Sequence, residues 1–428
     1  MTRGRLWLAD RILFVILLIA LAILIALFSQ ANIQSDSIDY YAILQKLTGN
    51  DHPPIVENLH FMAERSPGYS LAAVIPYCLV VWPLSMAFNT DRQISVQDQD
   101  GFQGMMQIPP YPLPSTGIFF HDFYLGGSIF QWKIILALLI TSYLALFGGI
   151  WLIARTLRLE SKNMPGISII LLVILASPIF MINVLQTPSY ATLFAFGLSC
   201  GFSFSFTRAC RSKNRVDELL CGLVLGALVL TRLETALMLA VVMMCLAADR
   251  DFRFCKNLAA GAITWLPVLF AYNMVLFGNP FHASILAGDI NLIMINPGYI
   301  SDCLINPASG VVFWSTLTVL GIIGLCVGRK ERHQRVFLAC SAAMIGLYLV
   351  RVPVMYLHTG AGTMEIGGIP IGMPATRDSA LALVRSDMNR YLTLLVPFAV
   401  LGLQGLPGVI FRALRPPGFP PRKALIEP

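Results

Sequence analysis

Charged residues are scarce in this sequence. Asp, Glu, Lys and Arg make up 12% of its 428 residues, about half the share found in soluble domains. Hydrophobic residues make up 56%, and the mean hydropathy is +0.71. No water-soluble fold could bury so much apolar surface, which excludes a soluble enzyme or binding module. The composition predicts a polytopic membrane protein.

Several common site motifs are also absent. The sequence has no His/Cys cluster, no phosphate-cradling Gly-rich loop and no G-x-S-x-G, and its nine cysteines form no disulfide framework. Asp98-Gln99-Asp100 has the D-x-D spacing of some metal sites, but it lies far from any predicted membrane edge. We therefore expect no cofactor to be required. A divalent metal is compatible with the chain but is not indicated.

Long apolar runs, in contrast, are plentiful. A spanning helix needs roughly 20 residues, and the apolar runs of this sequence predict an all-α polytopic membrane protein with about 10 transmembrane helices. Two of the runs are short and are joined through Thr231-Arg232-Leu233-Glu234, which allows one bent helix pair. The predicted spans lie near 12–29, 131–154, 166–185, 190–207, 218–231, 236–248, 257–277, 308–327, 335–350 and 391–411.

The distribution of charge predicts the topology. If the N-terminus is cytoplasmic, the inner segments hold 21 of the 30 basic residues but 8 of the 23 acidic ones. Every alternate loop then follows the positive-inside rule. The positive-inside rule therefore explains the net charge of +7, and no nucleic-acid partner is expected. The sequence predicts a multi-pass protein of the cytoplasmic membrane with both termini cytoplasmic, 412–428 forming the C-terminal tail.

The long loops all fall on the predicted outer, periplasmic side, at 30–130, 278–307 and 351–390. The first contains an apolar run at 71–88 that is interrupted by prolines, and we predict a helix in the outer interface there. An enzyme that uses ATP or nucleotide-sugars would be expected to place its polar mass inside. The distribution therefore favours chemistry on the outer face, where the activated donors are lipid-linked.

The first outer loop begins with the acidic stretch Ser35-Asp36-Ser37-Ile38-Asp39-Tyr40-Tyr41. If this stretch is helical, Asp36 and Tyr40 share one face, as do Asp36 and Asp39. A carboxylate near a low-dielectric boundary has a raised pKa, which suits a general base. The alternative is that Asp36 only caps a helix.

Other polar residues near the membrane edge are candidates for substrate binding. His121 and Asp122 close the first outer loop, where they would orient an acceptor or a phosphate, unless His121 is an ordinary loop histidine. Arg65 precedes the turn Ser66-Pro67-Gly68-Tyr69 and would reach a headgroup phosphate.

Two further arginines are candidates for binding the donor phosphate. Arg232 lies between two apolar segments, where a charge is costly and is either paired, here with Glu234, or functional. Arg390 opens the last span, and an arginine at a helix start favours a bound anion as its partner. Simple snorkelling to the interface is the alternative for Arg390.

The order of these residues along the chain resembles that in the GT-C glycosyltransferases. The resemblance covers roughly residues 10–411 and implies a single transmembrane domain over residues 1–411. The closest branch is the protein O-mannosyltransferase and aminoarabinose-transferase type. The matching pieces are Asp36 with Tyr40, Ser66-Pro67-Gly68-Tyr69, the stretch 117–123, a G-x-x-x-G from Gly222 to Gly226, Thr231-Arg232-Leu233-Glu234, Phe277-Gly278-Asn279-Pro280, Asn306-Pro307-Ala308-Ser309-Gly310 and Asn389-Arg390-Tyr391-Leu392.

The resemblance implies inverting transfer of a sugar from a polyprenyl-phosphate donor to a hydroxyl of an acceptor protein, glycan or lipid. It maps the catalytic base onto Asp36 and makes Tyr40 a neighbour that binds substrate. Asp39 is the candidate for the role of the second catalytic acid. The family usually has a second acid directly after the first, and Ser37 occupies that place here. Leu233 likewise replaces a usual proline.

Two other functions stay open. A transporter or flippase of a lipid-linked sugar would have internal repeats and broken helices; the sequence shows no repeat, but the region around Arg232 is a partial match. An O-antigen ligase or polymerase would place a key arginine and histidine in a large late outer loop. The loop 351–390 offers Arg351, His358, Arg377 and Arg385 for that role.

Overall fold

The computed structural model of the chain is mostly helical, as predicted. The described helices and helical turns of its bundle are α1 (Arg3–Phe28), α6 (Trp132–Glu160), α8 (Pro178–Leu185), α9 (Ala191–Ser212), α10 (Arg215–Thr231), η2 (Leu233–Thr235), α11 (Ala236–Ala248), α12 (Phe252–Ile263), α13 (Leu266–Phe277), α16 (Thr316–Gly328), α17 (Arg332–Val350), η3 (Thr393–Leu395) and α20 (Val396–Ala413). The structure describes residues 3–29, 35–49, 66–88, 93–95, 111–112, 119–120, 129–160, 177–185, 190–281, 291–328, 331–357, 363–366, 369–372, 377–378, 381 and 392–413.

The loops that are predicted to face outward contribute shorter elements. Their helices are α2 (Ser35–Leu47), α4 (Gly68–Pro76), the π-helical turn η1 (Tyr77–Val81), α5 (Trp82–Phe88), α14 (Pro297–Leu304) and α18 (Val354–Leu357). The short helix α15 (Val311–Trp314) lies just before α16, within the predicted span 308–327. Their strands pair only two at a time and antiparallel: β1 (Gln93–Ser95) with β4 (Ile129–Gln131), β2 (Tyr111–Pro112) with β3 (Phe119–Phe120), β5 (Asn291–Ile293) with β6 (Arg351–Pro353) and β7 (Thr363–Ile366) with β8 (Ile369–Gly372).

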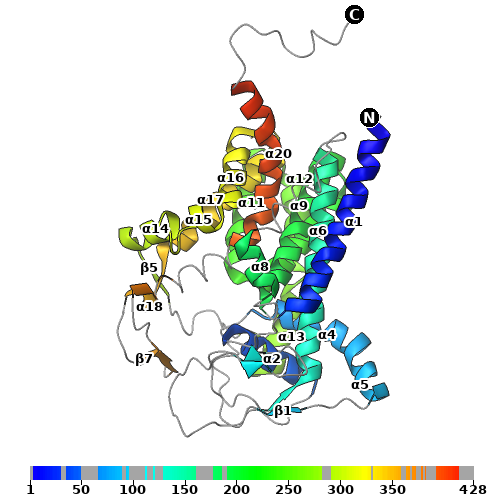
Figure 1. The fold of residues 1–428 in the computed structure, drawn as a ribbon, viewed down its shortest axis with the longest axis vertical. Helices are drawn as coiled ribbons and strands as arrows, with labels where there is room; N and C mark the ends of the chain where they lie inside the picture. The colour runs from blue at the N-terminus through cyan, green and yellow to red at the C-terminus, as the bar shows by residue number, and fades with distance from the viewer. Residues whose placement is uncertain are drawn as a thin grey trace, which may run out of the picture.

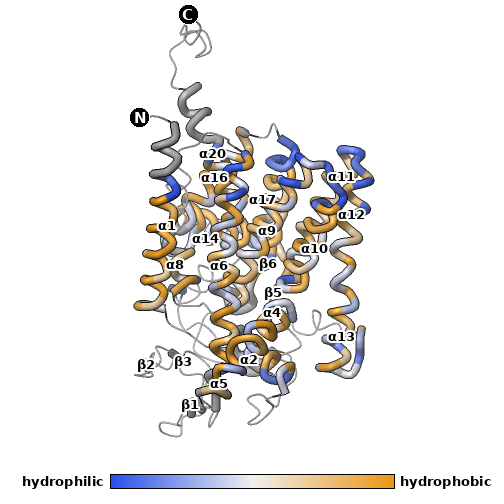
Figure 2. The backbone as a smooth tube through the Cα atoms, turned by 90° about the vertical axis from the view of Figure 1, so that its right-hand side faces the viewer, coloured by the Kyte–Doolittle hydropathy of each residue, from blue (hydrophilic) through white to orange (hydrophobic). Residues whose placement is uncertain are grey.

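The apolar helices identify a membrane protein. Among the described residues, six helices are long and apolar enough to cross a bilayer. They are Asp10–Phe28, Gly68–Ala87, Lys133–Glu160, Ala191–Ser212, Phe252–Val275 and Arg332–Val350. Apolar segments line the middle of the bundle, and polar ones gather at its upper end (Figure 2).

The predicted helix over 71–88 is present as one continuous rod, α4–η1–α5. Pro76 ends α4, and the π-helical turn that follows accommodates the break. The rod lies beside α2 at the lower end of the bundle (Figure 1). Because its length and composition also suit a span, its location in the interface stays a prediction.

α1 begins and α20 ends at the same end of the bundle (Figure 1). Ion pairs connect the helix ends there, so we call it the basic end. They are Arg208–Asp217, Arg211–Glu160, Arg253–Glu218, Arg332–Asp249, Arg332–Asp251 and Arg335–Asp249. α2, α4 and α5 lie at the opposite end, which we call the α2 end.

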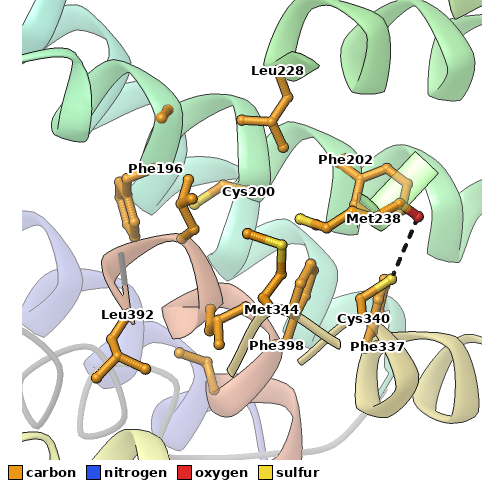
Figure 3. Close-up of a cluster of buried hydrophobic side chains, with 14 of the residues drawn as sticks. Phe196, Cys200, Phe202, Leu228, Met238, Phe337, Cys340, Met344, Leu392 and Phe398 are labelled. Atoms are coloured by element: carbon orange, nitrogen blue, oxygen red, sulfur yellow. Dashed lines mark hydrogen bonds between the residues drawn. The ribbon is translucent and has the colours of Figure 1, made fainter. Parts of the chain in front are cut away.

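Aromatic side chains fill the centre of the bundle. Phe337 of α17 stacks on Phe398 of α20, with ring centroids 4.8 Å apart, and Phe202 of α9 meets both rings edge-on (Figure 3). Cys340 Sγ lies 3.9 Å from the carbonyl oxygen of Met238, which brings α11 to the same cluster. This aromatic core packs α9, α11, α17 and α20 against one another.

Close helix contacts depend on glycine. A Cβ on Gly222 of α10 would collide with the carbonyl oxygen of Leu258 on α12, and one on Gly261 of α12 would collide with that of Leu219. Gly226 lies against Ala262 in the same way. The G-x-x-x-G of the family resemblance therefore acts here as a helix-packing surface.

Candidate functional site

The acidic stretch at the start of the first outer loop is helical, as the candidate site required. α2 begins at Ser35, so Asp36 and Tyr40 are one turn apart and Asp36 and Asp39 are three residues apart on the same helix. The backbone of Asp36 and Asp39 is described, but their side chains lie outside the described residues. Tyr40 is described fully and is only 5% exposed.

α2 is held against α4 by polar and aromatic contacts. Ser70 Oγ donates a hydrogen bond to the carbonyl oxygen of Tyr40 at 3.0 Å. The rings of Tyr40 and Tyr69 meet edge to face with centroids 5.1 Å apart. Tyr69 in turn bonds through its hydroxyl to the Leu138 carbonyl and to Ser142 of α6, at 2.9 and 2.8 Å. The segment with the acids is therefore anchored on a spanning helix through two tyrosines.

The turn before α4 is joined to the break between α10 and α11. The backbone N–H of Leu233 donates to Ser66 Oγ at 3.3 Å. Gly68 touches this break so closely that a Cβ would lie 2.7 Å from the backbone nitrogen of Thr231. Glycine is required at residue 68 because any side chain would push α4 away from α10.

The break itself confirms the bent helix pair that the sequence allowed. Arg232 is extended, with φ −145° and ψ 104°, between the end of α10 and η2. It pairs with Glu234, Nη1 to Oε1 at 3.1 Å, and both side chains are largely buried. Thr235 Oγ1 donates to the Arg232 carbonyl at 2.6 Å and closes the turn. The pairing of the two charges is the structural alternative considered for Arg232, and it is present.

The structure thus brings together three segments that the sequence singled out: α2, the Ser66–Tyr69 turn and the Thr231–Glu234 break. They meet at the α2 end, away from the basic end. His121, Asp122, Arg65 and Arg390 lie outside the described residues, so their predicted roles stay predictions.

A second polar cluster at the junction of the other two outer loops was not predicted. Asp302 of α14 is 8% exposed and accepts hydrogen bonds from the Tyr356 hydroxyl at 2.6 Å and from Asn306 Nδ2 at 2.8 Å. Arg377 Nη2 bonds to the same carboxylate and to the Tyr356 oxygen, the latter at 2.8 Å. Its guanidinium also stacks over the Tyr356 ring at 4.7 Å.

The contacts of this cluster keep Tyr356 and Arg377 protonated. Burial and the hydrogen bond to Asp302 raise the pKa of Tyr356, so the phenol stays a donor. The hydrogen bond with Tyr356 raises the pKa of Arg377, which stays charged. The cluster is best described as a clamp between the loops at 278–307 and 351–390. Sequence reasoning missed it because Tyr356 and Arg377 lie 54 and 75 residues from Asp302.

Two of the recurrent family pieces act here as turns. Gly278 has φ +67° and ends α13 in the left-handed conformation, and Asn279 Oδ1 accepts the backbone N–H of Phe281. In the other piece, Ser309 Oγ donates to the Asp302 carbonyl, and a Cβ on Gly310 would lie 2.7 Å from the backbone of Asn306. These pieces position the loops and contribute no free chemical group of their own.

Within the described part of the chain, no three His, Cys, Asp or Glu residues are grouped so that they could hold a metal ion. Asp98 and Asp100 lie outside it. Comparison with family models, curated proteins and solved structures found no match to this chain. The candidate site therefore has to be argued from its own residues.

Proposed function

We propose that the chain is a membrane glycosyltransferase that moves a sugar from a polyprenyl-phosphate donor to an acceptor hydroxyl. The observation that supports this most is the meeting of α2, the Ser66–Tyr69 turn and the Arg232–Glu234 break at one end of the bundle. These three segments are far apart in sequence and carry three of the pieces of the motif resemblance. Asp36 and Asp39 lie in the first two turns of α2.

In the proposed orientation the basic end is cytoplasmic and the α2 end faces outward. The positive-inside rule supports it, because the ends of α6, α9, α12 and α17 that carry arginine meet at one end of the bundle. About ten spans, both termini cytoplasmic and a large first outer loop with juxtamembrane helices complete the proposed topology. The membrane would be the cytoplasmic membrane.

The proposed reaction is a single displacement. Asp36 takes the proton of the acceptor hydroxyl, the oxygen attacks the anomeric carbon, and the bond from that carbon to the phosphate oxygen breaks. The configuration is inverted and the polyprenyl phosphate leaves with the bonding electrons. Cations stabilise the leaving phosphate, and Arg390 is the stronger candidate because Glu234 already neutralises Arg232.

Removing the protein from its cells tests the substrate class. The lipid-linked sugars of the membrane fraction are compared with and without the chain by mass spectrometry. The proposal expects one polyprenyl-phosphate sugar to accumulate and one glycosylated acceptor to disappear. An unchanged set of lipid-linked sugars would refute it.

A transporter of the same lipid-linked sugar is the second candidate, and the break at Arg232 favours it. Helices that are broken at membrane depth and carry a charged pair are common where transporters bind substrate. In that case the sugar donor accumulates without any transfer product from the purified protein. A transfer product formed by the purified protein, with donor and acceptor on the same side, excludes it.

A further inference from the structure

A cavity of about 580 Å³ lies at the basic end, away from the segments proposed for catalysis. Arginines from three helices line it: Arg11 of α1, Arg155 and Arg158 of α6, and Arg208 of α9. The remaining lining residues are Leu159 and Phe204, which give it an apolar wall. A pocket of this volume is large enough for a small ligand or a lipid headgroup.

Two carboxylates of the described residues interact with these arginines. Asp217 pairs with Arg208 at 3.0 Å, and Asp10 lies within electrostatic reach of Arg158. Glu160, which follows directly in α6, is instead paired with Arg211. Arg11 and Arg155 also lie within electrostatic reach of Arg158, so like charges gather around one hollow.

One of the arginines is also held in place. The guanidinium of Arg155 stacks over the Trp151 ring at 4.5 Å. Ordinary topology accounts for basic residues at these helix ends, where the positive-inside rule favours them. It does not require that arginines from three helices converge on one hollow.

We propose that this cavity binds the phosphate group of an anionic ligand. Arginine presents several donors in a planar fork that matches phosphate oxygens, and an anion would relieve the repulsion among the four guanidinium groups. Basic pockets between spanning helices bind phosphate headgroups of anionic lipids, and the apolar wall of Leu159 and Phe204 suits acyl chains. The site is independent of the proposed sugar transfer.

Equilibrium binding to the purified, delipidated full chain tests the site. The probes are tetraoleoyl cardiolipin, dioleoylphosphatidylglycerol, dioleoylphosphatidylcholine and sodium pyrophosphate. The variant Arg155→Gln/Arg158→Gln removes two of the lining charges. The control Arg215→Gln/Lys256→Gln removes two exposed charges from the same end that do not line the cavity.

We expect at least one phosphate-bearing anion to bind the wild type at least about tenfold more tightly than phosphatidylcholine. The cavity variant should lose about tenfold or more of that affinity, and the control variant should keep it. Binding of the anionic lipids without competition by pyrophosphate identifies a headgroup, and saturable binding of pyrophosphate identifies a soluble anion.

Equal affinity of the cavity and control variants would overturn the site. If the cavity variant does not fold, the wild type still decides: no preference for any anion over phosphatidylcholine overturns the proposal as well.

Discussion

The two ends of the bundle use charge in opposite ways. At the basic end, arginines and carboxylates of neighbouring helices form several pairs, among them those of Glu160, Asp249 and Glu218. At the α2 end, helices are joined instead by tyrosine and hydroxyl hydrogen bonds, such as Tyr69 to Ser142 and Ser70 to Tyr40. Away from the basic end, the charged pairs of the described residues include Arg232–Glu234 and Asp302–Arg377.

The difference separates charges that hold helices from charges that are available for chemistry. A network of exposed pairs sets orientation and joins helix ends, and each pair adds little to stability. A carboxylate next to apolar helices costs free energy, so each such carboxylate is expected to be paired or functional. Asp36 and Asp39 are predicted to be of that second kind, which is why the α2 end is the proposed reaction face.

The largest expected effect concerns the orientation of the two ends. In a Cys78→Ser/Cys326→Ser background, which removes the exposed cysteines of the described residues, Arg215→Cys at the basic end and Phe281→Cys after α13 are compared, because both side chains are exposed. A membrane-impermeant maleimide applied to intact cells should label residue 281 and leave residue 215 unlabelled until the membrane is opened. The reverse pattern would invert the proposed topology.

Two glycine substitutions should separate function from packing. Gly222→Ala forces α10 from α12 and should destabilise the protein by about 1–3 kcal/mol, measured as the thermal midpoint in detergent.

Gly68→Ala should displace α4 from the Arg232 break and lower sugar transfer about tenfold to a hundredfold. Gly148→Ala is the control, since nothing lies within 4 Å of its position. Full transfer by Gly68→Ala would remove this break from the site.

The buried carboxylates of the two ends offer a smaller test. Asp302→Asn should cost about 1–3 kcal/mol, because its oxygens accept from Tyr356, Asn306 and Arg377. Asp217→Asn should cost less, because Asp217 accepts from Ser212 Oγ and pairs with Arg208, one partner fewer than Asp302 has. Thermal unfolding of both variants measures the difference. A larger loss for Asp217→Asn would mean that the basic end carries more of the stability than proposed.

The smallest expected effect is the pH dependence of one basic-end pair. Burial opposes ionisation of Asp251, but its hydrogen bonds from Arg332 and from the Phe254 N–H lower its pKa below the usual value. The pair therefore stabilises the fold above the unfolded pKa of about 3.9, and this contribution is lost as the pH falls through the lower folded value. Asp251→Asn should remove that acid-dependent part, at most about 1 kcal/mol.

Much of the helical fold was predictable because consecutive residues specify a spanning helix, as an apolar run with charged ends. The bend at Thr231–Glu234 was also visible, since two charges interrupt an apolar run there. The segment at 257–277 shows the limit: the structure divides it into α12 and α13 at Trp265, with Pro267 in the first turn of α13. A proline in the first turn of a helix costs no hydrogen bond, because the backbone N–H groups there have no acceptor within the helix. The apolar run 257–277 alone therefore does not reveal that it forms two helices.

The site was predictable only in part for the same reason. The helical geometry of Asp36 and Tyr40 depends on five consecutive residues and was expected. The Asp302–Tyr356–Arg377 clamp depends on contacts across two loops, and nothing near Asp302 in the sequence indicates its partners. The arginine cavity likewise assembles side chains from three separate helices.

Sugar transfer by Asp36→Asn, in membranes that contain equal amounts of inserted protein, tests the central claim most directly. The account predicts that this variant loses transfer by at least about a hundredfold, as expected when a general base is removed, while Asp302→Asn retains measurable transfer. Wild-type transfer by Asp36→Asn would contradict it, because the α2 end would then hold no catalytic base at this residue.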